Sequence, residues 1–127
     1  MAKKEYTYRG RTLEELKKMP FSEFLLTIPA RERRSLKRGY RDEEKRLVER
    51  INKGESDIQT HCRRIVILPQ MIGSQVKVYD GKNFEPVNIE PDMVGHRLGE
   101  FAQTRKKVAH SAPGIGATKS SSHMSVK

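Results

Sequence analysis

The segment formed by residues 80–104 constrains the fold of this sequence more than any other part. It opens with Asp80 and Gly81, which join two runs, residues 75–79 and 82–89, where apolar and polar residues alternate. An Asp-Gly pair between two such runs is the strongest short-range signal for a β-hairpin. The sequence therefore predicts a hairpin with a two-residue loop in this region.

The predicted hairpin has two unlike faces. With a two-residue loop, Tyr79 lies opposite Lys82, and Lys77 lies opposite Phe84. These side chains share one basic and aromatic face, which is how a small sheet presents itself to RNA. The other face is apolar and belongs to the core, and its residues are Val76, Val78, Val87 and Ile89.

After the hairpin, Glu90 and Pro91 predict the start of a short helix, because proline suits the first helical position. Its apolar residues are Val94, Leu98 and Phe101.

Gly95 and Gly99 lie four residues apart on this segment, with His96 and Arg97 between them. The glycines are either flexible breaks or places where another chain or a phosphate approaches the backbone closely. The two side chains between them are candidate contacts.

Two short helices are predicted near the N-terminus, in residues 13–19 and 23–27. Thr12 and Glu15 have the spacing of a capping box, which starts the first of them. Ser22 offers a side-chain cap for the second helix. The apolar side of that helix faces the core or a partner, and it consists of Phe24, Leu25 and Ile28.

Residues 29–38 predict a third helix, with Gly39 as its C-terminal stop. Arg31, Arg34 and Arg38 share one side of it by their spacing of three and four. A solvated helix face is one interpretation. Because the helix contains a single acidic residue, contact with phosphates is the favoured one.

Residues 41–52 predict a fourth helix, in which acidic and basic residues alternate. This pattern indicates an ordinary solvated helix rather than an RNA-binding face. Residues 58–68 predict extended chain that ends in a buried, β-branched run. Arg63 and Arg64 lie at the exposed entrance of that run, so replacing both with alanine should leave the fold intact.

The charge of the chain is strongly positive and unevenly distributed. The net charge is +10, divided as +7 in residues 1–54, −2 in residues 55–103 and +5 in residues 104–127. A nearly neutral core between two basic arms favours a polyanionic partner, with nucleic acid before an anionic membrane. In the C-terminal arm the candidate contacts are Arg105, Lys106 and Lys107.

Composition restricts the remaining possibilities. The single cysteine, Cys62, excludes an intramolecular disulfide and suggests a reducing compartment. There is neither a 20-residue apolar run nor an apolar N-terminal signal, so we expect a soluble intracellular protein with no membrane partner. No histidine, cysteine or acidic spacing suggests a metal site or a catalytic pair. We therefore expect no enzyme activity, no cofactor and no small-molecule substrate.

These patterns together predict an α+β fold in a small domain. It contains N-terminal helices, a short sheet that includes a β-hairpin, a short helix, and basic flexible N- and C-terminal extensions. The predicted parts are an N-terminal arm (1–11), a helical region (12–54), an α+β core that binds RNA (55–104) and a basic flexible tail (105–127).

The hairpin and the segment after it resemble the small-subunit ribosomal protein S-nineteen family. The matching positions are Asp80-Gly81-Lys82, Ile89, Val94-Gly95, Leu98-Gly99, Glu100-Phe101 and Thr104. Upstream, Arg63-Arg64, Ile67-Leu68-Pro69 and Met71-Ile72-Gly73 also look like the family. The resemblance is strong over residues 58–110. The N-terminal helices and residues 113–118 look like its archaeal and eukaryotic branch.

This resemblance implies a structural constituent of the small ribosomal subunit, ribosome-bound in the cytoplasm, that binds the 3′ domain of the small-subunit rRNA in the subunit head. It implies ribosomal protein S-thirteen as a neighbour and a tail directed toward the decoding region and the aminoacyl-site tRNA. Residues 120–127 are less basic than typical family tails, which weakens the tRNA expectation. The basic positions that match are Arg63, Arg64, Lys77, Lys82, His96, Arg97 and Arg105.

Two alternatives remain open from the residues alone. One is a protein-interaction module whose first two helices dock a partner and whose basic charge is incidental. The other is a basic RNA-binding protein, or a DNA- or tRNA-binding factor, that acts away from the ribosome.

Overall fold

The computed structural model describes residues 5–108, and residues 1–4 and 109–127 lie outside this description. The chain begins with a two-stranded ribbon, β1 (Thr7–Tyr8) and β2 (Arg11–Thr12), which pair antiparallel. Four helices follow: α1 (Leu13–Lys18), α2 (Phe21–Thr27), α3 (Ala30–Lys37) and α4 (Asp42–Asn52). These elements make up the N-terminal half of the protein.

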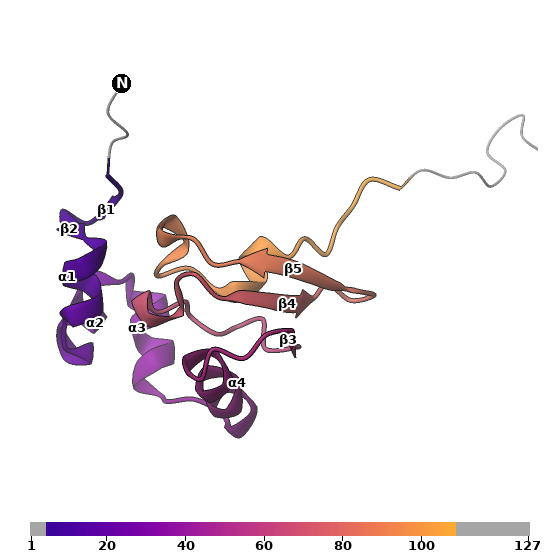
Figure 1. The fold of residues 1–127 in the computed structure, drawn as a ribbon, viewed down its shortest axis with the longest axis horizontal. Coiled ribbons are helices and arrows are strands. Elements are labelled where there is room, and N and C mark those ends of the chain that lie inside the picture. The colour runs from indigo at the N-terminus through magenta and orange to yellow at the C-terminus, as the bar shows by residue number, and fades with distance from the viewer. Residues whose placement is uncertain (1–4, 109–127) are drawn as a thin grey trace, which may run out of the picture.

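A three-stranded sheet forms the second half. Its strands are β3 (Ile58–Thr60), β4 (Gln75–Tyr79) and β5 (Phe84–Asn88), in the order β3-β4-β5. β3 runs parallel to β4, and β4 runs antiparallel to β5. Figure 1 shows α1 and α2 at one end of the molecule, α4 beside β3, and the β4–β5 loop at the opposite end. The architecture confirms the predicted α+β class.

The hairpin is present, but its predicted register is wrong. Tyr79 pairs with Phe84 rather than with Lys82, so the loop has four residues. Asp80 explains the longer loop: its Oδ1 accepts hydrogen bonds from the backbone amides of Lys82 and Asn83, at 2.9 and 2.6 Å. A turn held by an aspartate side chain replaces the expected two-residue turn. Because the register differs by two, the strand residues keep their predicted faces, whereas Lys82 lies in the loop and not on the aromatic face.

The core lies between the apolar face of the sheet and the helices. Fully buried residues of the sheet are Ile58, Val76 and Val78, and residues 65–68 are also buried. That run is not a strand, although it forms one bridge, between Val66 and Arg97. Its backbone pairs with the glycine-containing segment instead, through bonds such as that from the amide of Ile67 to the carbonyl of His96, 2.8 Å long.

Side-chain caps were predicted at the N-termini of the first two helices. The prediction is correct for α1 and wrong for α2. Thr12 and Glu15 form the predicted capping box of α1. The predicted cap at Ser22 is wrong, because α2 begins at Phe21, two residues before the predicted start at Glu23. The carbonyl of Pro20 there accepts from the amides of Glu23 and Phe24, each at 3.1 Å. Proline thus sets the start of α2.

The helix predicted after the hairpin is instead two short 3₁₀ turns, Pro91–Met93 and Leu98–Phe101. Between them, Gly95 has a φ of +82°, a value that disfavours other residues. A Cβ on Gly95 would lie 2.7 Å from the Tyr8 hydroxyl oxygen. Within the described chain, the close approach at Gly95 is made by the N-terminal ribbon, and Arg63 makes the one at Gly99.

No helix within residues 5–108 is long and apolar enough to cross a membrane.

Candidate nucleic-acid interface

The predicted contact residues fall into two groups in the structure. In the first group, side chains are bonded to other parts of the protein: Arg63, Arg64, Lys77, His96, Arg97 and Lys106. In the second group, side chains are exposed and form no ion pair with the described part of the chain: Arg31, Arg34, Arg38, Lys82, Arg105 and Lys107. Only the second group has its charges free for a phosphate.

Arg63 joins three segments of the core. Its guanidinium donates to the carbonyl oxygens of Tyr79 (2.6 Å), Gly99 (2.6 Å) and Ala102 (2.7 Å). These bonds tie the end of β4 to the second 3₁₀ turn, and Gly99 leaves room for the Arg63 side chain. The expectation that this arginine can be removed without harm to the fold is therefore not supported by the structure.

Arg97 connects the glycine-containing segment to α3. Its Nη2 donates to Ser35 Oγ at 2.8 Å, and its Nε lies 3.4 Å from Glu32 Oε1. The Arg97 and Glu32 side chains are only 15% and 11% exposed. A charge pair with so little exposure depends on both partners, because either one left alone would be desolvated and unpaired.

Arg64 holds α4 in a similar way. Its Nε lies 3.2 Å from Glu44 Oε1, and the Glu44 side chain is 6% exposed. The other Glu44 oxygen accepts from the backbone amide of Arg41 at 2.9 Å, which caps the helix. Glu32 and Glu44 are the buried acidic residues of the described chain, and each is paired with an arginine predicted to bind RNA.

The side chains of Lys77 and His96 contact acidic residues on the protein surface. The Lys77 ammonium contacts the Asp57 carboxylate, and His96 Nδ1 lies 2.9 Å from Glu100 Oε2. These groups are substantially exposed, so each pair contributes little stability. Neither pair therefore fixes its basic side chain as firmly as the less exposed Arg97 pair does.

Lys106 folds back onto the hairpin loop. Its Nζ lies 3.2 Å from Asp80 Oδ2 and also contacts Glu85. The hydrogen bonds that Asp80 accepts from the Asn83 and Lys82 amides, together with Lys106, lower the pKa of its carboxyl group from 3.8 to about 2. The loop therefore carries fixed negative charge beside the start of the basic tail.

α3 and its C-cap residue carry three exposed arginines that form no ion pair within residues 5–108. Glu32 and Leu36 point inward and are buried, whereas Arg31, Arg34 and Arg38 are exposed. Arg33 is different: its guanidinium donates to the carbonyls of α2 residues Leu25 (2.7 Å) and Leu26 (3.2 Å) and of Ile28 (3.0 Å). This structural role of Arg33 was not predictable from the sequence, in which Arg33 is one of several neighbouring arginines.

The free cations do not form one patch. Figure 1 shows α3 on the helical side of the molecule, whereas the β4–β5 loop with Lys82 lies at the far end of the sheet. The chain that follows residue 104 leaves near the sheet, which places Arg105 and Lys107 away from α3. A polyanion that touches all of them must extend along the long axis of the protein.

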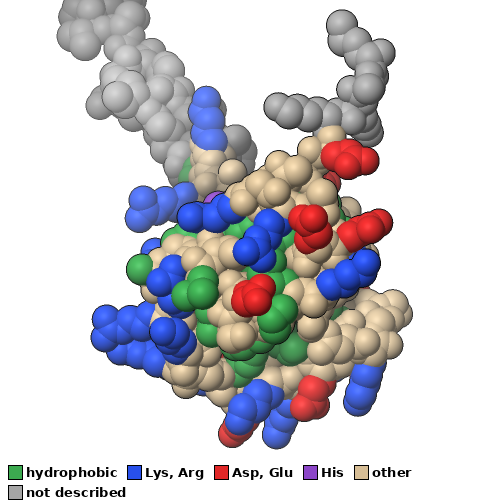
Figure 2. All heavy atoms as spheres, turned by 90° about the vertical axis from the view of Figure 1, so that its left-hand side faces the viewer, with side chains coloured by type: hydrophobic (Ala, Val, Ile, Leu, Met, Phe, Trp, Pro, Cys, Tyr) green, Lys and Arg blue, Asp and Glu red, His purple; other side chains and the backbone are tan. Residues whose placement is uncertain are grey.

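An apolar surface lies on α1 and α2. Phe21 is 49% exposed and Leu26 is 70% exposed. Phe21 also lines a depression of about 70 Å³ together with Phe24, Leu68 and Lys17. Figure 2 shows hydrophobic side chains gathered at the centre of this end of the molecule, with charged side chains around them. Exposed hydrophobic groups of this size suit a protein contact better than a phosphate backbone.

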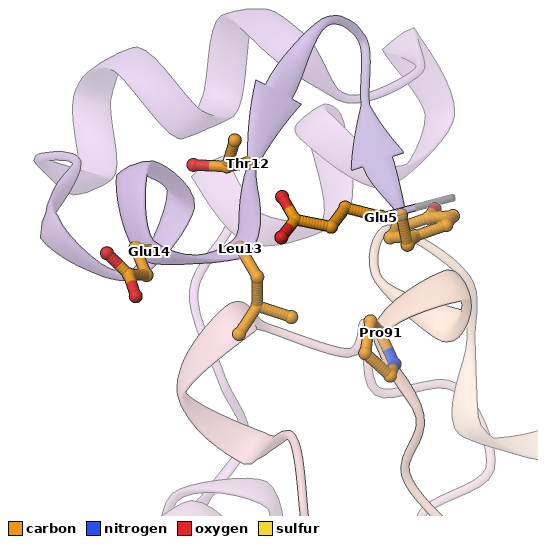
Figure 3. Close-up of a pocket in the computed structure, with 6 residues that line it drawn as sticks. Glu5, Thr12, Leu13, Glu14 and Pro91 are labelled. Carbon is orange, nitrogen blue, oxygen red and sulfur yellow. The ribbon is translucent and has the colours of Figure 1, made fainter. Parts of the chain in front are cut away.

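A second depression, of about 460 Å³, lies between the N-terminal arm and α1. Glu5 extends across it toward Thr12, and Leu13 and Pro91 form its other side (Figure 3). Glu14 is also part of its lining, and none of the lining residues is a cation. Two carboxylates without a cation disfavour a phosphate here.

Comparison with known proteins identifies the family of the chain. Residues 34–110 match a family model described as Ribosomal protein S19. A curated relative, small ribosomal subunit protein uS19 of Methanococcoides burtonii, is 43% identical over 125 residues. The match covers 98% of this chain and 91% of the relative. It therefore includes the N-terminal helices as well as the hairpin segment.

Proposed function

The chain belongs to the ribosomal protein S19 family, and we propose that it is a structural constituent of the small ribosomal subunit that binds rRNA in the subunit head. The observation that carries the RNA-binding part is α3, which buries its only glutamate and turns Arg31, Arg34 and Arg38 to solvent. A helix side with several free guanidinium groups is suited to phosphates. Its contribution is to position and stabilise folded RNA, not to catalyse a reaction.

The proposed partner is the 3′ domain of the small-subunit rRNA, and the proposed location is the ribosome in the cytoplasm. Lys82, Arg105 and Lys107 supply further free charges at the end of the molecule distant from α3. Two separated sets of cations favour contacts with two different parts of a folded RNA rather than with one helix.

Ribosomal protein S-thirteen is the proposed protein neighbour. The exposed Phe21 and Leu26 on α2 support a protein contact, since RNA offers little apolar surface to cover them. The C-terminal tail is proposed to extend toward the decoding region and the aminoacyl-site tRNA. Most of that tail, residues 109–127, lies outside the described residues.

Sedimentation of a cell lysate through a sucrose gradient tests the proposal. The protein should sediment with small subunits in low salt and should leave them as salt rises, because phosphate contacts weaken with ionic strength. A protein that remains at the top of the gradient in low salt would contradict the proposal and would favour a factor that acts away from the ribosome.

A protein-interaction module is the second candidate, and the exposed apolar surface of α2 favours it. In that case retention on purified ribosomes would be insensitive to salt, and replacing Phe21 and Leu26 with serine would abolish it. The proposed function predicts instead that the serine variant still binds naked rRNA with wild-type affinity.

A further inference from the structure

A groove runs along the side of α4 that faces residues 59–64. It consists of two adjoining depressions of about 310 and 260 Å³. Glu43, His61 and Cys62 line both of them, so they form one continuous surface feature. The charge pattern of α4 alone predicted an ordinary solvated helix, whereas the fold brings this helix against a second, basic segment.

Guanidinium groups line the groove along its whole length. Arg41 and Arg46 are exposed and form no ion pair with the part of the chain that the structure describes. Arg64 lines the first depression with Arg41 and pairs with Glu44, with 3.2 Å between Nε and Oε1. Arg50 lines the second depression with Arg46, and its Nε lies 2.7 Å from Glu55 Oε2. Each depression thus has one arginine that is held by an ion pair and one that is free.

His61 is exposed and lines both depressions of the groove. Its ring centroid lies 4.5 Å from that of Tyr79 and 5.2 Å from that of Phe84. Tyr79 and Phe84 also contact each other, at 5.2 Å. Both rings pack against the imidazole, so its position is set by packing.

We propose that this groove binds one unpaired nucleotide of RNA, with the base against His61 and the flanking phosphates on Arg41 and Arg46. This inference rests on the proposed function. It adds a second RNA contact site, on α4, to the one proposed on α3. Unpaired bases stack on aromatic side chains, including histidine, and arginine binds the adjacent phosphates. A protein segment fits less well, because the lining leucine, Leu47, is buried and offers no apolar surface to a partner.

Glu43 gives the site a preference among bases. Its carboxylate is exposed within a lining that is otherwise mainly basic, where it would repel a phosphate but accept a hydrogen bond from a base. Cytosine has an amino donor at the position where uracil has a carbonyl acceptor, so a carboxylate favours cytosine. The groove should therefore select cytosine over uracil.

Fluorescence anisotropy with labelled single-stranded RNA decamers of cytidine or uridine tests this inference on the full chain. The wild type should bind the cytidine decamer at least about fivefold more tightly than the uridine decamer. The Glu43→Gln variant should remove this preference, because glutamine donates as well as accepts. An unchanged preference in that variant would overturn the assignment.

Two variants that each lose one positive charge show whether binding depends on the groove itself or on the overall positive charge of the protein. Arg46→Gln should weaken binding of both decamers and lower the salt slope by about 0.7, the value for one contact with a single strand. Lys53→Gln removes the same charge just beyond the end of α4 and outside the groove, and should leave the slope unchanged. Equal effects of the two substitutions would contradict a localised site.

His61→Ala tests stacking and should weaken binding of both decamers by at least about fivefold. Thermal unfolding of this variant must be measured as well, because the ring packs on Tyr79 and Phe84; Arg46 and Glu43 are exposed and test the site independently. If the groove variants bind like the wild type while α3 variants lose rRNA affinity, the groove inference fails and the proposed function stands. If the wild type binds neither decamers nor rRNA in a salt-dependent way, both fail.

Discussion

Gly99 and Arg63 fit together so closely that a side chain at position 99 would collide with the arginine. A Cβ on Gly99 would lie 2.8 Å from Arg63 Cβ and 2.9 Å from the Arg63 carbonyl oxygen. The Arg63 guanidinium in turn donates to the Gly99 carbonyl at 2.6 Å. A glycine in a segment predicted to contact RNA therefore serves the internal packing of the protein.

Replacing Gly99 with alanine should lower the free energy of unfolding by about 2 kcal/mol, because the clash is with backbone and with the root of a side chain. Urea denaturation measures this value. Gly73→Ala is the matched control, since a Cβ there meets nothing within 4 Å and only its φ of +89° is unfavourable. That control should cost about 1 kcal/mol. Equal losses would contradict the close packing at Gly99.

Arg63→Lys keeps the positive charge but cannot reach three carbonyls in the fork geometry of a guanidinium. We expect the free energy of unfolding to fall by about 1–3 kcal/mol, because partly buried carbonyl groups lose their donor. The salt slope of RNA binding should not change. If the variant were as stable as the wild type and bound RNA with a lower slope, Arg63 would be a phosphate contact instead.

Glu32→Gln tests whether the Arg97–Glu32 pair positions α3 for RNA, or whether only the net charge of the protein affects binding. The substitution raises the net charge by one, so charge alone predicts tighter binding to RNA. We predict about fivefold weaker binding, together with a loss of about 1–2 kcal/mol in stability, because Arg97 loses its ionic partner on α3. Filter binding to rRNA and urea denaturation measure the two effects.

Glu49→Gln is the matched control for this substitution, because Glu49 lies exposed on α4 and forms no ion pair with the described chain. It should bind RNA as tightly as the wild type or more tightly. If Glu32→Gln behaved in the same way, Arg97 and Glu32 would not position α3.

Local features were predictable from the sequence. The capping box at Thr12 and Glu15 depends on residues only three apart in the sequence. The position of the hairpin followed from Asp80 and Gly81. Its register did not, because the loop length is set by the side chain of Asp80, which binds two backbone amides. Alternation was preserved, which is why the core face was assigned correctly.

The distinction between structural and free arginines was not predictable. Arg34 and Arg97 look alike in the sequence, yet Arg97 pairs with Glu32, 65 positions away, while Arg34 stays in solvent. Parallel pairing of β3 with β4 also depends on long-range contact. Charge counts therefore identify a basic protein but not which cations remain available after folding.

Asp80 predicts a dependence of stability on acid pH. Its pKa is about 2 in the folded protein and 3.8 when unperturbed, so the folded state binds fewer protons within this window. The stabilisation is complete above pH 3.8 and is lost as pH falls through about 2. Asp80→Asn should remove this contribution while its side-chain oxygen still accepts from the loop amides.

Thermal unfolding of the wild type and of Asp80→Asn between about pH 5 and pH 2 measures this effect. The difference in midpoint between the two proteins should shrink as pH falls through the window. A constant difference would mean that the Asp80 carboxylate and Lys106 do not stabilise the loop through charge.

The salt dependence of binding to an rRNA transcript of the small-subunit 3′ domain tests the central claim most directly. The Arg31→Gln, Arg34→Gln, Arg38→Gln triple variant should lower the log–log salt slope by about 2–3, since each phosphate contact contributes roughly 0.7–0.9. The control variant Lys17→Gln, Lys18→Gln, Lys53→Gln removes equal charge from elsewhere and should retain the wild-type slope. Equal slopes for the α3 variant and the wild type would contradict the assignment of α3 as an RNA-binding surface.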